Sequence, residues 1–101
     1  MRLEAVFTID PDRLRAFQDT LDNVARCCMK TIGRPGLSNL TNAKLGKFLY
    51  GLMNQRLTIE RRVRERGPSE FDKLLKFIGR ALEALETADR ESSDEKTSPR
   101  E

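Results

Sequence analysis

The clearest helical pattern in this chain lies in Asp10–Cys28, which has the sequence DPDRLRAFQDTLDNVARCC. Asp10 is a favoured N-cap residue, Pro11 suits the first helical position, and Asp12 places negative charge at the positive end of the helix dipole. Apolar residues then recur every three or four positions, so that they share one helix face. These residues are Leu14, Phe17, Leu21, Val24, Ala25 and Cys28. We therefore predict an amphipathic helix that begins after Asp10 and ends before the glycine- and proline-containing stretch 33–36.

A second helix is predicted from Thr41 to Arg66, with Thr41 as its N-cap. Leu40 before the cap and Leu45 in the next turn have the spacing of a hydrophobic staple. When successive residues are placed 100° apart, as in an α-helix, the apolar residues collect within one arc. This arc contains Leu45, Leu49, Leu52, Met53, Ile59 and Val63, with Phe48 at its border. We expect the arc to face the core.

The opposite side of this second helix is a band without acidic residues. It consists of Lys44, Lys47, Gly51, Gln55, Thr58, Arg61, Arg62 and Arg66. Lys44 lies in the first turn, where a cation opposes the helix dipole, and Gly51 costs roughly 1 kcal/mol relative to alanine. Because a glycine allows another backbone to approach closely, the band is interpreted as a surface for phosphates and sugar hydroxyls.

A third helix is predicted from Ser69, its N-cap, to Ala88. Its apolar stripe is Phe71, Leu74, Leu75, Ile78, Ala81, Leu82, Leu85 and Ala88. The outer side of its first half carries Lys73, Lys76 and Arg80. Residues 89–101 are almost wholly polar and are therefore expected to form a disordered tail.

The first nine residues have the period-two alternation of a half-buried strand. No second strand signal follows. This segment is therefore expected either to pair with a second copy of the protein or to pack as an extended or helical arm. The predicted fold is all-α: a single helical domain over residues 1–88, built as a small bundle of three main helices, with an extended or strand-like N-terminal arm and the polar tail 89–101.

The composition argues against an enzyme. Of the 101 residues, 38% are hydrophobic and 35% are charged, which favours slim helices over a deep pocket for a small-molecule substrate. The chain has no histidine and no glycine-rich phosphate loop, so nucleophilic and metal-assisted catalysis lack their parts. The only cysteines, Cys27 and Cys28, are adjacent and are expected to be buried, reduced thiols. We predict no catalytic residues, no cofactor and no metal site.

No stretch of the sequence approaches the roughly 18 to 20 apolar residues that span a bilayer. We therefore expect a soluble, cytoplasmic protein without a membrane partner.

The basic residues are concentrated in the middle of the chain. Between Arg26 and Arg66 there are ten basic and two acidic residues, a net charge of +8, whereas the remainder holds nine basic and 14 acidic residues, a net charge of −5. A field polarised in this way favours a polyanionic partner. The candidate contacts to a nucleic-acid backbone are Lys44, Lys47, Gln55, Arg61, Arg62, Arg66, Lys73, Lys76 and Arg80.

Two stretches resemble a known family. Leu40–Leu49, LTNAKLGKFL, resembles the opening of the central helix in the helical small subunits of type III-A (Csm) CRISPR effector complexes, and Phe71–Ile78, FDKLLKFI, resembles the last helix of those proteins. The resemblance implies a non-catalytic subunit of an antiviral ribonucleoprotein complex, which stacks in several copies beside larger subunits along guide and target RNA. Carried over by position, the RNA-facing candidates are Lys44, Lys47, Arg61 and Arg62.

Other interpretations stay open. The strand-like start followed by an Asp-Pro sequence and an amphipathic helix, in Arg2–Leu21, is similar to the opening of ribbon–helix–helix repressors, which bind DNA as dimers. A third possibility is a structural module whose basic band contacts an acidic protein surface. Basic residues near a helix C-terminus are also favoured by the dipole alone, so the band can be a solvated face without a partner.

Overall fold

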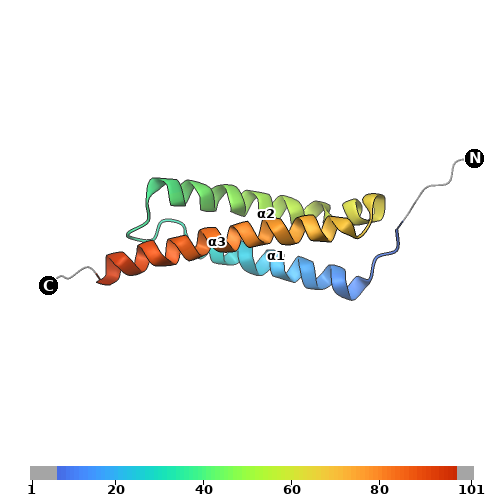
Figure 1. Cartoon of the computed structure of the whole chain (residues 1–101), viewed down its shortest axis with the longest axis horizontal. Coiled ribbons are helices and arrows are strands. Elements are labelled where there is room, and N and C mark those ends of the chain that lie inside the picture. The colour runs from blue at the N-terminus through green and yellow to red at the C-terminus, as the bar shows by residue number, and fades with distance from the viewer. Residues whose placement is uncertain (1–6, 98–101) are drawn as a thin grey trace, which may run out of the picture.

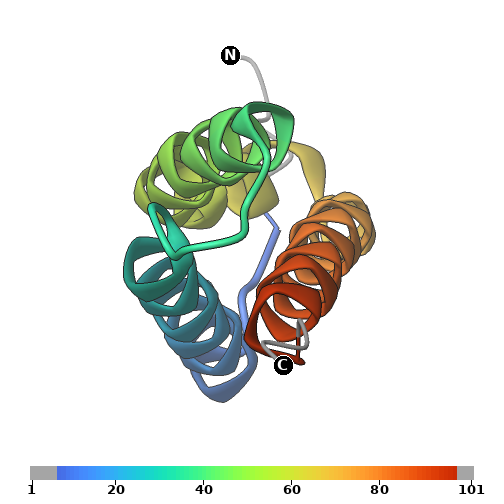
Figure 2. The same ribbon diagram turned by 90° about the vertical axis from the view of Figure 1, so that its left-hand side faces the viewer.

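Three helices form an elongated bundle in which successive helices run in opposite directions (Figure 1). The computed structural model describes the backbone of residues 7–97 and the side chains of residues 7–93. The helices are α1, Pro11–Thr31, α2, Asn39–Arg66, and α3, Ser69–Thr97. Viewed along the bundle, they occupy the corners of a triangle (Figure 2). The prediction of an all-α fold with three main helices is confirmed.

Helix α1 has the predicted bounds and the predicted buried face. The Asp10 carboxylate accepts a hydrogen bond from the Asp12 N–H at 3.0 Å, as an N-cap does. The helix ends at Thr31, and Gly33 follows with a φ of +86°, a conformation that glycine adopts without steric cost. Leu21, Val24 and Cys28 are buried, and three residues pack beside them at the edge of the core. These three are Leu14, Phe17 and Ala25.

Helix α2 begins earlier than predicted, because Ser38 rather than Thr41 is its N-cap. The Ser38 hydroxyl accepts the Thr41 N–H at 3.1 Å, while Thr41 is buried within the first turn. Leu40 therefore lies inside the helix, where it is 66% exposed and cannot form the predicted staple with Leu45. The prediction of a Thr41 cap and a Leu40–Leu45 staple is wrong.

The core is built from all three helices. Leu45, Leu52, Ile59 and Val63 of α2 are buried as predicted, whereas Met53 is 56% exposed and the prediction for it is wrong. The buried residues of α1 and α3 complete the core. They are Leu21, Val24, Cys28, Phe71, Leu74, Ile78, Ala81, Ala84 and Ala88. The α1 and α3 sides also meet through the stacked rings of Phe17 and Phe71, whose centroids are 4.6 Å apart.

Helix α3 continues past Ala88, where the sequence placed the end of the helical domain. Ser92 is buried, and the Glu91 carboxylate accepts hydrogen bonds from the Ser38 N–H at 2.9 Å and the Thr41 hydroxyl at 2.8 Å. These polar residues satisfy the first turn of α2, so the bundle includes a segment that composition alone assigned to the tail. Residues 98–101 of the predicted tail lie outside the described residues.

Residues 7–10 form an arm without helix or strand. The Phe7 N–H donates to the Arg64 carbonyl at 3.0 Å, and the Phe7 ring packs over Gly67. A Cβ on Gly67 would lie 3.2 Å from Phe7 Cζ, and its φ of +100° also favours glycine. Of the alternatives left open by the sequence, the packed arm is the one seen for 7–10. Residues 1–6, which carry most of the strand pattern, lie outside the described residues.

Two glycines in α2 have opposite surroundings, which predicts opposite effects of alanine. A Cβ on Gly46 would meet nothing within 4 Å, so Gly46→Ala should raise the free energy of unfolding by about 0.5 to 1 kcal/mol. A Cβ on Gly51 would lie 2.6 Å from Phe77 Cζ. Overpacking costs about 1 to 3 kcal/mol, so Gly51→Ala should be destabilising by about 1 kcal/mol net. Urea unfolding followed by circular dichroism measures both; equal stabilisation by the two substitutions would contradict the packing of Phe77 on Gly51.

Candidate nucleic-acid interface

An open groove of about 630 Å³ lies between the first half of α2 and residues 77–91 of α3. Its apolar lining includes Phe48 of α2 and Phe77 and Ala84 of α3. Its basic side chains are Lys44, Lys47 and Arg80, three of the nine residues that the sequence selected as nucleic-acid contacts. The remaining lining residues are Ser38, Leu40, Thr41, Glu83, Thr87 and Glu91.

The antiparallel packing of α2 and α3 explains why these residues meet. Gly51 leaves room for the Phe77 ring against the α2 backbone, and Phe77 then lies 5.5 Å from Phe48, measured between ring centroids, at an interplanar angle of 59°. Lys44 and Lys47 lie within one turn of Phe48, and Arg80 lies one turn beyond Phe77. The two rings are thus flanked by cations from both helices.

Gly51 therefore has a different role from the one predicted. Its missing side chain admits an aromatic ring of α3, and it does not face an external backbone. The helical cost of the glycine is explained by packing within the protein.

The three basic side chains of the groove are exposed and have no polar partner among the described side chains. Within residues 7–93, no ion pair or side-chain hydrogen bond involves Lys44, Lys47 or Arg80. Two acidic residues also line the groove, but the Glu91 carboxylate is held by Ser38 and Thr41 at one end. The backbone N–H of Ser38, followed by the Thr41 hydroxyl, lowers the pKa of Glu91 below its ordinary value of 4.5. The other acid, Glu83, is exposed.

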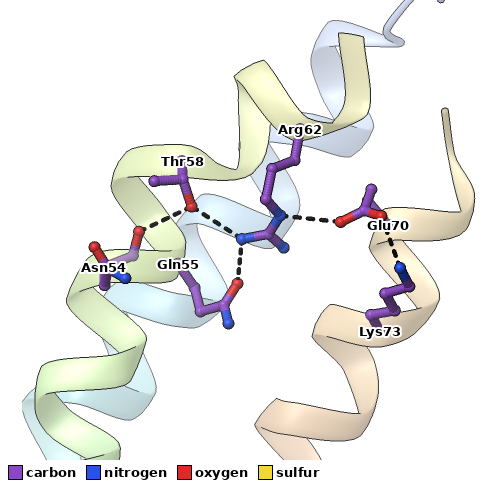
Figure 3. A network of polar contacts seen from close by, with 6 residues as sticks. All are labelled: Asn54, Gln55, Thr58, Arg62, Glu70 and Lys73. Carbon is purple, nitrogen blue, oxygen red and sulfur yellow. Dashed lines mark hydrogen bonds and ion pairs between the residues drawn. The ribbon is translucent and has the colours of Figure 1, made fainter. Parts of the chain in front are cut away.

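The sequence predicted that Arg62 and Gln55 lie on an outer surface. In the structure they belong to a polar network between α2 and α3 (Figure 3). The Arg62 side chain is only 16% exposed. Its Nε donates to Glu70 Oε1 at 3.0 Å, and its Nη1 donates to Thr58 Oγ1 at 2.9 Å and to Gln55 Oε1. The prediction placed these residues opposite the core, but α3 packs against that side of α2.

Glu70 is the centre of this network, and sequence reasoning missed it. Its side chain is 3% exposed, and its second oxygen accepts from Lys73 Nζ at 3.0 Å. Lys73, another predicted nucleic-acid contact, is therefore engaged within the protein, although 69% of its side chain remains exposed. The only feature of the sequence that pointed to this role is the position of Glu70, in the first turn of α3 and close in sequence to the basic end of α2.

The other three predicted contacts, Arg61, Arg66 and Lys76, are exposed and do not line the groove. The nine candidates thus divide by surroundings. Lys44, Lys47 and Arg80 share the groove; Gln55, Arg62 and Lys73 join the Glu70 network; the remaining three lie elsewhere on the surface. The apolar lining by Phe48, Phe77 and Ala84 was not foreseen. The sequence indicated this lining only through Phe77, a large apolar residue that lies outside the apolar stripe predicted for its helix.

The two cysteines differ from each other. Cys28 is buried, as predicted, and burial together with the neighbouring Cys27 raises the pKa of its thiol. Cys27 is exposed, so the prediction of two buried thiols is wrong for it, because adjacent positions on a helix point about 100° apart. Among the described residues, no group of three or more histidine, cysteine, aspartate or glutamate side chains could hold a metal ion.

None of the helices within residues 7–97 has the length and apolar character needed to cross a membrane.

The Glu70 network predicts a loss of stability in acid. The hydrogen bond from Lys73, aided by Arg62 and opposed by desolvation, lowers the pKa of Glu70 below its ordinary value of 4.5. A carboxylate whose pKa is lower in the folded state stabilises the fold above the unfolded pKa, and this contribution is lost as the pH falls through the folded pKa. The free energy of unfolding should therefore decrease below about pH 4.5, and the decrease should be smaller for Glu70→Gln.

Urea unfolding at several pH values between neutral and acid measures this difference. Glu86→Gln, on an exposed position of the same helix, is the matched control and should follow the wild type. An acid-induced loss of the same size in wild type and Glu70→Gln would contradict the assignment.

Comparison with protein-family models, with curated proteins and with solved structures found no match.

Proposed function

We propose that this protein is a non-catalytic RNA-binding subunit that holds a sugar–phosphate backbone along the groove between α2 and α3. The observation that carries the proposal is the convergence of Lys44, Lys47 and Arg80 on this groove without partners among the described side chains. Three cations without a carboxylate partner among the described side chains leave a local positive field available to a polyanion. Lysine and arginine side chains in one groove suit contacts to phosphates, and such contacts position a nucleic acid without specifying its sequence.

The proposal includes assembly with other subunits, either further copies of this chain or larger proteins. Its support is the resemblance of two stretches to CRISPR small subunits and the presence of large apolar side chains on the outside of α2. Tyr50, Met53 and Leu57 are 77%, 56% and 80% exposed and follow one another at spacings of three and four residues. A contiguous exposed apolar stripe is typical of a surface that contacts another protein.

The alternative of a ribbon–helix–helix repressor receives less support. In that class, paired strands from two copies enter the major groove of DNA. Here the Phe7 N–H is used within the chain, by the carbonyl of Arg64. The other residues of that strand pattern, 1–6, lie outside the described residues.

Salt dependence of RNA binding tests the proposal. Each phosphate neutralised on a single strand contributes about −0.7 to the slope of log K against log salt, so three contacts predict a slope near −2. Fluorescence anisotropy with labelled single-stranded RNA, repeated across a range of salt concentrations, gives the slope. A slope near zero, or no binding at low salt, would count against a phosphate-binding groove. Tight binding to an acidic protein without binding to RNA would favour the structural module.

A further inference from the structure

The groove has an apolar aromatic lining that backbone binding does not use. Lysine and arginine on a plain helix face also bind phosphates, yet here Phe48, Phe77 and Ala84 line the same groove as the cations. Its volume of about 630 Å³ falls within the range of ordinary ligand sites. Resting on the proposed function, we infer that the groove receives an unstacked nucleobase of single-stranded RNA while Lys44, Lys47 and Arg80 hold the adjacent phosphates.

Charge and ring geometry favour a nucleotide as the occupant. The two half-buried rings of Phe48 and Phe77 have centroids 5.5 Å apart and are tilted by 59°. They form two walls at an angle, against which a flat ring can pack. Aromatic side chains beside a cationic track are how proteins hold single strands, because every base has a π-face to stack. A purely apolar ligand would leave the three cations unused, and a duplex would keep its bases stacked inside.

One of the two acidic residues of the groove, Glu83, also fits a base better than a phosphate. Glu91 is occupied by Ser38 and Thr41, but Glu83 has no hydrogen-bond or ion-pair partner among the described side chains. A carboxylate repels phosphate and accepts hydrogen bonds from exocyclic amino groups, such as the N4 amino group of cytosine. Uracil presents a carbonyl oxygen at the same ring position. Glu83 should therefore favour cytosine over uracil in the groove.

The first experiment separates base insertion from backbone binding. An oligocytidine and an abasic oligomer with the same number of phosphates are titrated into the protein at low salt. The oligocytidine should bind on the order of tenfold more tightly, because only it can place a base against the rings. Equal affinity for the two would overturn the inference and leave the proposed function standing. Failure of both to bind would overturn the proposed function and the inference together.

The second experiment tests the residues. Phe48→Leu keeps an apolar side chain and removes the ring, so it should reduce the preference for oligocytidine over the abasic oligomer at least severalfold. Its affinity for the abasic oligomer serves as the internal measure of folding and should not change. Glu83→Gln should bring the affinities for oligocytidine and oligouridine close to each other, because glutamine both donates and accepts. An unchanged preference in both variants would overturn the inference.

Discussion

Reversing the charge of Lys44, Lys47 and Arg80 together, by substitution with glutamate, should weaken RNA binding at least 100-fold at about 0.1 M salt. Three phosphate contacts on a single strand each contribute about 0.7 log unit per tenfold change in salt. Their loss thus removes about two log units of affinity at that concentration, before repulsion by the new carboxylates is counted. The slope of log K against log salt should become shallower by about 2.

A variant with the same change in net charge provides the control. Arg15, Arg26 and Lys30 are exposed residues of α1 that do not line the groove. Their replacement by glutamate changes the overall charge equally but should leave the salt slope unchanged. If the two triple variants lose affinity and slope to the same extent, binding depends on net charge and the groove is not the site. Thermal unfolding of both variants, followed by circular dichroism, shows whether each is folded.

Breaking the Arg62–Glu70 pair should have the largest effect on stability among single substitutions of charged residues. Glu70→Ala should lower the free energy of unfolding by about 3 kcal/mol, because removing one partner of a buried pair leaves the other charge without compensation. Arg62→Ala should cost less, since Lys73 remains 3.0 Å from the Glu70 carboxylate. Urea unfolding of the two single variants and of the double variant measures the coupling between the residues.

An exposed pair on α2 is the matched control for this measurement. The side chains of Arg64 and Glu60, in an (i, i+4) pair at 2.9 Å, are 53% and 49% exposed. Glu60→Ala should change the free energy of unfolding by no more than about 0.5 kcal/mol, as measured for exposed pairs of this spacing. If Glu70→Ala proves no more destabilising than Glu60→Ala, burial does not strengthen the network in the way described.

The Glu70 network also affects how the basic residues are to be interpreted. Gln55, Arg62 and Lys73 were selected from the sequence because charged or polar residues on one helix face suggest a ligand. In the structure Arg62 and Lys73 both donate to the Glu70 carboxylate, and Gln55 accepts from the Arg62 guanidinium. If a substitution of Arg62 weakens RNA binding, the loss of affinity can therefore come from a less stable fold as well as from a lost RNA contact. The groove cations are exposed, so their substitution does not disturb the core.

Much of the fold was predictable because its signals are local. The Asp10 cap, the helix end before Gly33 and the spacing of Leu21, Val24 and Cys28 all depend on residues within a few turns of one another. The end of α3 was mispredicted because Glu91 contacts Ser38 and Thr41 across 50 or more positions in the chain, and no short-range pattern reveals such a contact. The start of α2 was mispredicted although its cap is local, because Ser38 and Thr41 are both favoured N-cap residues and the structure shows which of them caps the helix.

Three amphipathic helices and the concentration of cations on the middle one were readable from the sequence, since helical periodicity and charge are properties of neighbouring residues. The side of α2 that faces α3 depended on tertiary packing. In a triangular bundle each helix is covered by two neighbours, and the direction of the second neighbour follows from long-range contacts. Phe77 of α3 packs on Gly51 of α2, so the side of α2 that carries part of the predicted basic band faces α3. On that side Arg62 donates a hydrogen bond to Glu70. The same packing brought Arg80 across from Lys44 and Lys47 and formed the groove.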